Sequence, residues 1–429
     1  MRRLFLLVSL LLYASVLSAE NWPQLRGPDR QGRARGPAPT SWSETENVLW
    51  KRAIPGKGWS SPVVWGNRIW ITTALSADST SKVSPSKQVP TVKAGELSLR
   101  AVSVDRTTGR IIDNIELFTP SEIDSIHSLN TYASPTPVIE AGRLYCHFGA
   151  YGNACVDTTT GEVLWRRVIK VDHSVGPGSS TVLYKNLLIL TYDGIDRQFI
   201  TALDKSTGEP VWRTNRPPVR AGNPEQHKAY STPLIVPVGG TDQLMGPTAQ
   251  WFVAYDPLTG SELWRMEHGA GFSVVPSPVA TEGVVYFSSG YLAPEMISVR
   301  TDGSGDVTNT HVLGRIKRQA PTQSSPLLVG QRIYTVSEAG VGVCLNDSLS
   351  KVLWQKRLGG NYSASPLLAG GKVYFFSREG VGTVVDNGEQ GPTIESRNQL
   401  DGMIMATPAI VDGQLFIRTA EHLYCIGET

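Results

Sequence analysis

Histidines are the residues of this sequence best suited to acid–base chemistry or metal binding, because imidazole titrates near neutral pH and is the commonest metal ligand. Four of the seven lie in connections between apolar runs: His127, His173, His227 and His268. They precede the Ser or Thr that opens the next run by 9, 7, 5 and 9 positions, so their rings would not lie at one depth. We therefore predict loop histidines and no metal site.

Other catalytic motifs are weak. No G-x-S-x-G is present, which argues against a serine hydrolase. The four cysteines, Cys146, Cys155, Cys344 and Cys425, show neither metal-ligand nor haem-attachment spacing. The sequence therefore predicts no catalytic residue.

The cysteines leave two structural alternatives. Cys155, Cys344 and Cys425 stand where other copies of an internal repeat carry Ala, which predicts small buried core residues. Alternatively, Cys146 and Cys155 face each other across the "HFGAYGNA" hairpin and form a disulfide in an oxidising compartment.

Composition narrows the class of protein. The 429 residues include 42 Gly and 28 Pro, and no helical periodicity recurs, which favours a turn-rich β structure. Residues 1–19, with Arg2 and Arg3 before an apolar run, predict a signal peptide, since the run is shorter than the roughly 20 residues of a membrane span. Its removal leaves 38 basic and 38 acidic residues and no basic stripe, so nucleic acid is not an expected partner. We expect an exported protein without a membrane span, in the periplasm or outside the cell.

A repeat organises the rest of the chain. A Ser or Thr, usually followed by Pro, opens an apolar run at Ser61, Thr136, Ser180, Thr232, Ser277, Ser325, Ser365 and Thr407. The starts are 75, 44, 52, 45, 48, 40 and 42 residues apart, a period that fits one four-stranded antiparallel blade each. The prediction is an all-β, eight-bladed β-propeller over residues 47–429.

A second motif supports this division. D-x-x-T-G recurs between the third strand (C) and the fourth strand (D) of a unit, where Asp bonds the turn backbone and Gly adopts a positive φ. A tryptophan follows on strand D, and we predict that it packs between neighbouring blades. These blade-docking residues are Trp50, Trp165, Trp212, Trp264 and Trp354.

The last unit has room for strands A, B and C only. The segment "NVLWKRA", residues 47–53, has the pattern of a strand D, so we predict that it completes the last blade and closes the ring. Residues 20–46 are rich in Gly and Pro and predict an irregular arm along the ring, with solvated arginines.

The pattern A-x-D-x-x-T-G-x-x-x-W, as in "ALDKSTGEPVW" and "AYDPLTGSELW", resembles the tryptophan-docking repeat of the PQQ-like eight-bladed β-propellers. That family includes quinoprotein alcohol dehydrogenases and the outer-membrane assembly protein BamB. The resemblance covers nearly the whole chain after residue 19. It implies the fold, but it does not choose between an enzyme and a binding protein.

In such a meander the D to A connections and the B to C turns share one face of the ring. The D to A connections carry aromatic and hydrogen-bonding side chains suited to a protein, peptide or carbohydrate. The predicted ligand-binding residues are His127, Asn130, Tyr132, His173, His227, Lys228, Tyr230, Asn361 and Tyr362. The first blade carries an insertion of about 20 residues within 74–97 on the same face, which predicts either a recognition loop or a mobile flap without a role.

Two functions remain open. The first is a non-catalytic binding scaffold of the cell envelope, monomeric and without a cofactor. The alternative is a PQQ-dependent oxidoreductase with Ca²⁺, which would need oxygen ligands for the cation and a carboxylate base. The sequence lacks the adjacent cysteine pair that many such enzymes share, and its loop carboxylates show no cation-site spacing.

Overall fold

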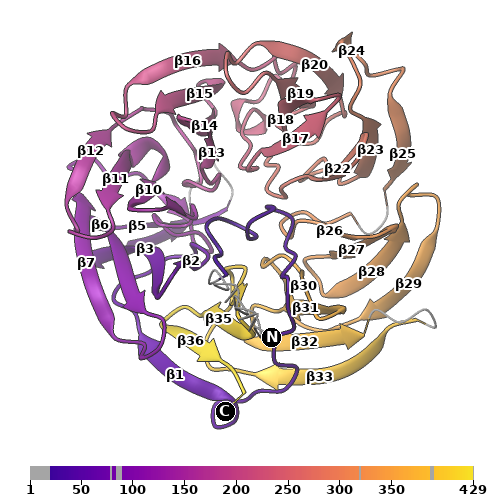
Figure 1. Ribbon diagram of the computed structural model, residues 1–429. Coiled ribbons are helices and arrows are strands. Elements are labelled where there is room, and N and C mark those ends of the chain that lie inside the picture. The colour runs from indigo at the N-terminus through magenta and orange to yellow at the C-terminus, as the bar shows by residue number, and fades with distance from the viewer. Residues whose placement is uncertain (1–19, 78–79, 84–88, 318–319, 387–390, 429) are drawn as a thin grey trace, which may run out of the picture.

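The structure is a computed structural model and describes residues 20–77, 80–83, 89–317, 320–386 and 391–428. The predicted signal peptide lies outside the described residues. Eight blades, each with four antiparallel strands, surround a central axis (Figure 1), which confirms the predicted all-β, eight-bladed propeller; a short fifth strand pairs in parallel with the fourth blade. The described part contains only two short 3₁₀ turns, η1 (Gly149–Tyr151) and η2 (Pro224–Gln226).

The blades follow one another along the chain. Blades one to four contain β2 (Val63–Trp65), β3 (Arg68–Ala77), β6 (Glu96–Asp105) and β7 (Ile111–Phe118); β9 (Val138–Glu140), β10 (Arg143–His147), β11 (Asn153–Asp157) and β12 (Val163–Arg167); β13 (Val182–Tyr184), β14 (Leu187–Asp193), β15 (Gln198–Asp204) and β16 (Pro210–Asn215); and β17 (Leu234–Val238), β18 (Thr241–Pro247), β19 (Trp251–Tyr255) and β20 (Glu262–Glu267).

Blades five to eight contain β21 (Val279–Thr281), β22 (Val284–Ser288), β23 (Met296–Arg300) and β25 (Val312–Ile316); β26 (Leu327–Val329), β27 (Arg332–Val336), β28 (Val341–Asn346) and β29 (Val352–Arg357); β30 (Leu367–Ala369), β31 (Lys372–Phe376), β32 (Val381–Asp386) and β33 (Thr393–Gln399); and β34 (Ala409–Val411), β35 (Gln414–Arg418), β36 (His422–Ile426) and β1 (Val48–Ala53). Strand β1 pairs with β36, so the N-terminal strand closes the last blade as predicted.

The hydrophobic core lies between the blades. Strand β14 is buried along its whole length, whereas the outermost strand β29 alternates between half-buried and exposed residues. Apolar clusters join each blade to the next; one of them combines Ile189 and Ile200 of the third blade with Leu244 and Val253 of the fourth. A strand buried on both faces needs a continuous apolar sequence, which explains the short apolar runs of the repeat.

The docking tryptophans show why the C to D turn needs glycine. The indole Nε1 of Trp50, Trp165 and Trp212 donates to the carbonyl of Arg106, Lys205 and Pro257, each directly after the motif Asp of the next blade. The indole rings cover Gly109, Gly208 and Gly260, whose φ values are +68°, +73° and +72°. A Cβ there would overlap the ring, so the turn and the docking both require glycine.

Trp264 and Trp354 differ from this arrangement. Trp264 is fully buried and donates to Gln243 of its own blade, and the short strand β24 (Gly305–Asp306) pairs in parallel with β20 beside it. Trp354 packs against Tyr334 in the cluster between the sixth and seventh blades.

The Ser or Thr that opens each repeat is buried and links neighbouring blades. In six of the eight, the backbone N–H donates to the side-chain hydroxyl of the equivalent residue in the next blade, over 2.8–3.0 Å. The six bonds run from Ser61 to Thr136, Thr136 to Ser180, Ser180 to Thr232, Ser277 to Ser325, Ser325 to Ser365 and Ser365 to Thr407. We call these eight residues the hydroxyl girdle.

The N-terminal arm, residues 20–46, crosses the centre of the ring before it reaches β1 (Figure 1). Backbone hydrogen bonds join Trp22 to Val64 in β2, Pro23 to Ile139 in β9, and Gly32 to Leu368 in β30. The arm therefore covers the central channel at the end where the A to B turns lie. The expectation of solvated arginines is wrong for Arg26 and Arg30: Arg26 donates to the carbonyl of Pro326, directly before β26, and Arg30 donates to that of Leu183 in β13.

The cysteines are free and buried. Cys146 pairs with Ala154 and packs between the first and second blades, whereas Cys155 pairs with Tyr145 and packs between the second and third. Adjacent strand positions point to opposite faces of the sheet, so the Cys146–Cys155 disulfide is wrong and the small core residue is correct.

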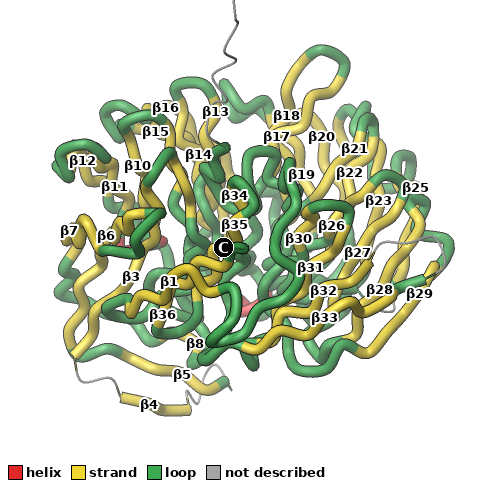
Figure 2. The backbone as a smooth tube through the Cα atoms, turned by 60° about the horizontal axis from the view of Figure 1, so that its bottom comes forward, coloured by secondary structure: helices red, strands yellow, loops and turns green. Residues whose placement is uncertain are grey.

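The insertion in the first blade is partly β structure. Strands β4 (Thr80–Val83) and β5 (Pro90–Lys93) form a hairpin, and β5 pairs with β8 (Ile126–His127) of the following D to A connection. The hairpin projects beyond the body of the ring (Figure 2). Its described part is therefore fixed by strand pairing, in contrast to a mobile flap.

Candidate functional site

The face predicted to bind a ligand is defined by the β5–β8 pairing. This contact joins the B to C insertion of the first blade to the D to A connection after it, so both kinds of loop lie on one face. We call it the loop face, and the face with the A to B and C to D turns the turn face.

His127 lies in β8 on the loop face and is half-buried. Its Nδ1 accepts a hydrogen bond from the backbone N–H of Leu129 at 3.1 Å. Burial lowers the pKa of His127, and the cations of Lys228 and Arg378 lower it further, while Glu338 opposes them. The imidazole is thus neutral at neutral pH and faces charges from three other loops.

Asn130 and Tyr132 hold their loop in place. The amide Nδ2 of Asn130 donates to the carbonyls of Val175 and Pro177 in the next D to A connection. The Tyr132 hydroxyl donates to the carbonyl of Asp124 and accepts from the N–H of Ala94, and its ring is buried. Burial also raises the pKa of Tyr132.

His173 and Tyr230 connect two adjacent loops. The Tyr230 hydroxyl donates to the carbonyl of His173 at 2.6 Å. The His173 ring stacks on Tyr192 with centroids 6.3 Å apart, and its two nitrogens are buried without a partner among the described residues. Burial lowers the pKa of His173 to about 3, so the ring is neutral under ordinary conditions.

Lys228 is buried, and the carboxylate of Glu225 balances the positive charge of its ammonium group. Nζ lies 2.5 Å from Glu225 Oε2 and 3.2 Å from Ser174 Oγ, and the Ser174 hydroxyl donates to the same carboxylate. His227 beside it bonds the carbonyl of Ala221 through Nε2. This cluster links the D to A connections on either side of the third blade.

Asn361 and Tyr362 lie on the other side of the ring. Asn361 is exposed and donates to Glu379 through its backbone and its amide. Tyr362 is buried, with its hydroxyl unpartnered among the described residues, and burial raises its pKa to about 12. The structure therefore spreads the nine residues around the loop face: His127, His227 and Asn361 retain exposed surface, and the buried tyrosines and Lys228 position the loops.

Three features of the loop face were not found from the sequence. Arg216 makes a fully buried two-point ion pair with Asp193, at 2.9 and 3.0 Å. Arg378 bonds Glu338 and Gln323 across the sixth and seventh blades. Arg418 is buried between the eighth and first blades, where it bonds Ser60 and Thr72 and burial lowers its pKa to about 9. None of these residues belongs to a repeat motif, so the sequence offered no signal.

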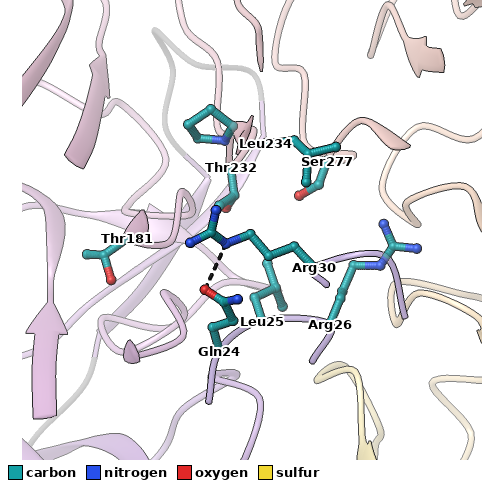
Figure 3. A pocket seen from close by; sticks show the side chains of 9 residues that line it. Gln24, Leu25, Arg26, Arg30, Thr181, Thr232, Leu234 and Ser277 are labelled. Atoms are coloured by element: carbon teal, nitrogen blue, oxygen red, sulfur yellow. Dashed lines mark hydrogen bonds between the residues drawn. The ribbon is translucent and has the colours of Figure 1, made fainter. Parts of the chain in front are cut away.

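Beneath the loop face, a small cavity lies where side chains of the arm meet the inner strands (Figure 3). A cavity of about 10 Å³ lies between Gln24, Arg30, Thr232 and Ser277, which is room for about one water molecule. The Arg30 Nε donates to Gln24 Oε1, and burial lowers the pKa of Arg26 and Arg30 to about 10. A ligand the size of a sugar or quinone does not fit in this cavity.

A calcium–quinone site would need a cluster of oxygen ligands on the loop face. Within the described ranges, no three His, Cys, Asp or Glu side chains come together as a metal site. The loop-face carboxylates of Glu225, Glu338 and Asp193 are each engaged by a lysine or arginine. A cation needs several free oxygen ligands, and these three carboxylates are not free to supply them.

The fold and the docking motif define a tryptophan-docked, eight-bladed propeller of the PQQ-like class. Residues 65–214 and 248–421 match the family model described as outer membrane protein assembly factor BamB, and the chain belongs to this family. A search of curated proteins finds no match.

Solved structures show the same fold. BamB from Moraxella catarrhalis is 13% identical, with a TM-score of 0.53 over 83% of this chain and 98% of its own. The quinohemoprotein alcohol dehydrogenase from Comamonas testosteroni is 11% identical, with a TM-score of 0.60 over 97% and 82%. A europium-containing methanol dehydrogenase is 11% identical, with a TM-score of 0.60 over 93% and 89%. At these identities the comparison supports the fold alone.

No helix in the part of the chain that is described has the length and hydrophobicity to cross a membrane.

Proposed function

We propose that this protein is an exported, non-catalytic binding scaffold of the cell envelope that recognises a protein, peptide or carbohydrate on its loop face. The observation that carries the proposal is the bonding between adjacent loops. Asn130 donates to two carbonyls of the next D to A connection. Tyr230, in the D to A connection after that, donates to the carbonyl of His173. Loops fixed before binding lose little conformational entropy when a partner docks.

Exposed apolar side chains on the same face support a protein partner. Tyr291 and Leu292, in the B to C turn of the fifth blade, are each 58% exposed. The turn is fixed by backbone pairing of Tyr291 with Phe272 and by ring contact between them. Leu292 has a φ of +78°, a costly conformation for leucine, which the surrounding structure imposes. Rigid, exposed aromatic and aliphatic side chains are typical anchors of protein interfaces.

Site-specific photocrosslinking tests this proposal. A photoreactive residue replaces Tyr291 on the loop face or, as a control, Leu258, which is 43% exposed in a C to D turn on the opposite face. We expect a discrete crosslinked partner in the envelope fraction from position 291 and none from 258. Crosslinks confined to position 258 would refute the placement.

The proposed export is tested separately: the intact mass of the protein from the envelope fraction shows whether the chain is cleaved before Glu20.

The alternative is a PQQ-dependent oxidoreductase. It is supported by the similarity in fold between this chain and the two dehydrogenases. Titration of the purified protein with PQQ and Ca²⁺, followed by dye reduction with alcohols and sugars, separates the two functions. Stoichiometric binding with substrate-dependent reduction would replace the scaffold proposal. We expect neither.

A further inference from the structure

A cleft of about 500 Å³ lies beside the first blade, away from the central channel. The strands β3 and β6 form one wall and the segment after β7 forms the other. Its lining residues are Leu75, Ala77, Gly95, Glu96, Leu97, Ser98, Glu116, Thr119, Pro120, Ser121 and Ile123. This volume is within the range of ligand sites in proteins.

The cleft lies at a strand edge that the fold leaves open. Strand β3 pairs with β6 along its full length, as far as Ala77 opposite Glu96. Strand β7 ends at Phe118, opposite Leu99. Residues Glu96–Ser98 therefore have β3 on one side and, among the described strands, no partner on the other. An open edge presents unpaired backbone N–H and C=O groups to an incoming strand.

The side chains around this edge specify an occupant. Leu97 and Ile123 are largely buried and give the cleft an apolar floor. Among the described residues, two glutamates and no lysine or arginine line it. Glu116 is paired with Arg100, whereas Glu96 is exposed and has no ion-pair partner among the described residues. A segment that alternates basic and apolar side chains complements both features.

We propose that this cleft binds an extended, basic segment of a partner protein, which adds a strand to β6 in line with β7. Backbone hydrogen bonds to Glu96–Ser98 supply affinity, and alternate side chains meet the apolar floor and Glu96. The inference rests on the proposed binding function and names a partner chemistry for one part of the loop face. It also gives the insertion a role, because the insertion lengthens β3 and β6 beyond β7.

A second copy of this chain is a weaker fit. A stable dimer interface buries about 1,200 Å² or more in total. An edge of three residues inside a concave cleft is too short to supply this by pairing with an equally short edge. A single peptide strand enters such a cleft without matching a second folded surface.

The probe is a labelled, end-blocked hexapeptide of alternating Lys and Val, followed by fluorescence anisotropy with the full mature protein. We expect saturable binding that is at least tenfold weaker for the Glu-for-Lys peptide. Only alternate N–H groups of an added strand face β6. One of two peptides, N-methylated at the Lys or at the Val positions, should therefore lose binding and the other should retain it. Absence of saturable binding, or equal effects of both methylation patterns, would overturn the proposal.

Variants locate the site. Glu96→Lys should weaken binding of the Lys–Val peptide about tenfold, and Ser121→Trp should block the cleft. The matched control Glu162→Lys reverses an exposed glutamate on the turn face and should leave binding unchanged. Thermal unfolding within about 2 °C of the parent verifies folding. Equal weakening by Glu96→Lys and Glu162→Lys would overturn the site, as would a dimer that Glu96→Lys dissociates. If the cleft proposal fails in either way, crosslinking from position 291 would persist. Failure of the cleft proposal is therefore distinguishable from failure of the proposed binding function.

Discussion

The indole nitrogen of Trp165 donates a hydrogen bond of 3.0 Å to the carbonyl of Lys205 in the next blade. The same ring covers Gly208, where a Cβ would lie 2.7 Å from the indole. One side chain of the second blade therefore docks on the turn of the third, and Trp50 and Trp212 make the same contact with Gly109 and Gly260 of their next blades.

Trp165→Ala should lower the free energy of unfolding by about 3–5 kcal/mol, because it removes a large packed ring and leaves a void between two blades. Trp165→Phe should cost less, since it retains part of the ring and loses the hydrogen bond. Urea unfolding monitored by circular dichroism measures both. Leu164→Ala is the control, because Leu164 is 39% exposed on the same strand. A cost for Trp165→Ala no larger than that of the control would contradict blade docking.

Thr232→Val tests the hydroxyl girdle. The Thr232 hydroxyl accepts a 2.8 Å hydrogen bond from the N–H of Ser180, and both residues are buried. Valine has nearly the same shape, so the change leaves a buried N–H without its acceptor, at a cost of about 1–3 kcal/mol. Thr393→Val, at an exposed position of β33, is the matched control. Equal unfolding midpoints for the two variants would show that the girdle bonds contribute nothing measurable.

The fold was predictable from sequence because its determinants are local and repeated. The Asp, Gly and Trp of the C to D turn recur at fixed spacing in several blades, and the apolar runs reveal the inner strands. Closure by β1 followed from the resemblance of "NVLWKRA" to other D strands. The sequence did not indicate why a Ser or Thr opens each repeat, because the hydroxyl bonds to the equivalent residue of a neighbouring blade, which is distant in the chain.

The site was less predictable, since its contacts join segments that share no pattern. Topology placed the D to A loops on one face, but it could not show that Tyr132 and Tyr362 turn inward or that Asn130 bonds the next loop. The arm is a similar case. Arg26 and Arg30 donate to backbone carbonyls inside the ring, and every residue has a carbonyl, so the sequence does not indicate which one accepts the bond. The predicted Cys146–Cys155 disulfide was wrong because the strand register, which the sequence does not reveal, places the two side chains on opposite faces of the sheet.

Deletion of residues 20–58 should destabilise the whole ring. It removes β1 with Trp50 from the last blade, and it removes Trp22 and Trp42, which are 0% and 2% exposed. We expect failure to fold or a melting temperature lower by more than about 10 °C, compared with the chain that begins at Glu20. Trp22→Ala keeps β1 and should cost about 3–5 kcal/mol, which separates the arm from ring closure. Melting of the truncated chain within a degree or two of the parent would contradict a shared last blade.

Acidification should destabilise the protein before most of its carboxylates are protonated. Burial lowers the pKa of His147 and His268 to about 4 and that of His173 to about 3. The unfolded chain binds these protons near pH 6.5, whereas the folded chain does not, so the free energy of unfolding falls as the pH decreases below 6.5. Each histidine contributes about 1.4 kcal/mol per pH unit, and the loss ends near pH 4 for two of them and near pH 3 for His173. Together they lower stability by about 5 kcal/mol between pH 6.5 and 5, because each is only half protonated in the unfolded chain at pH 6.5. Urea unfolding at half-unit steps of pH measures the slope, and His268→Gln, which can still donate to the Thr248 carbonyl, should reduce that slope by about a third. An unchanged slope in this variant would show that His268 does not remain neutral in the folded protein.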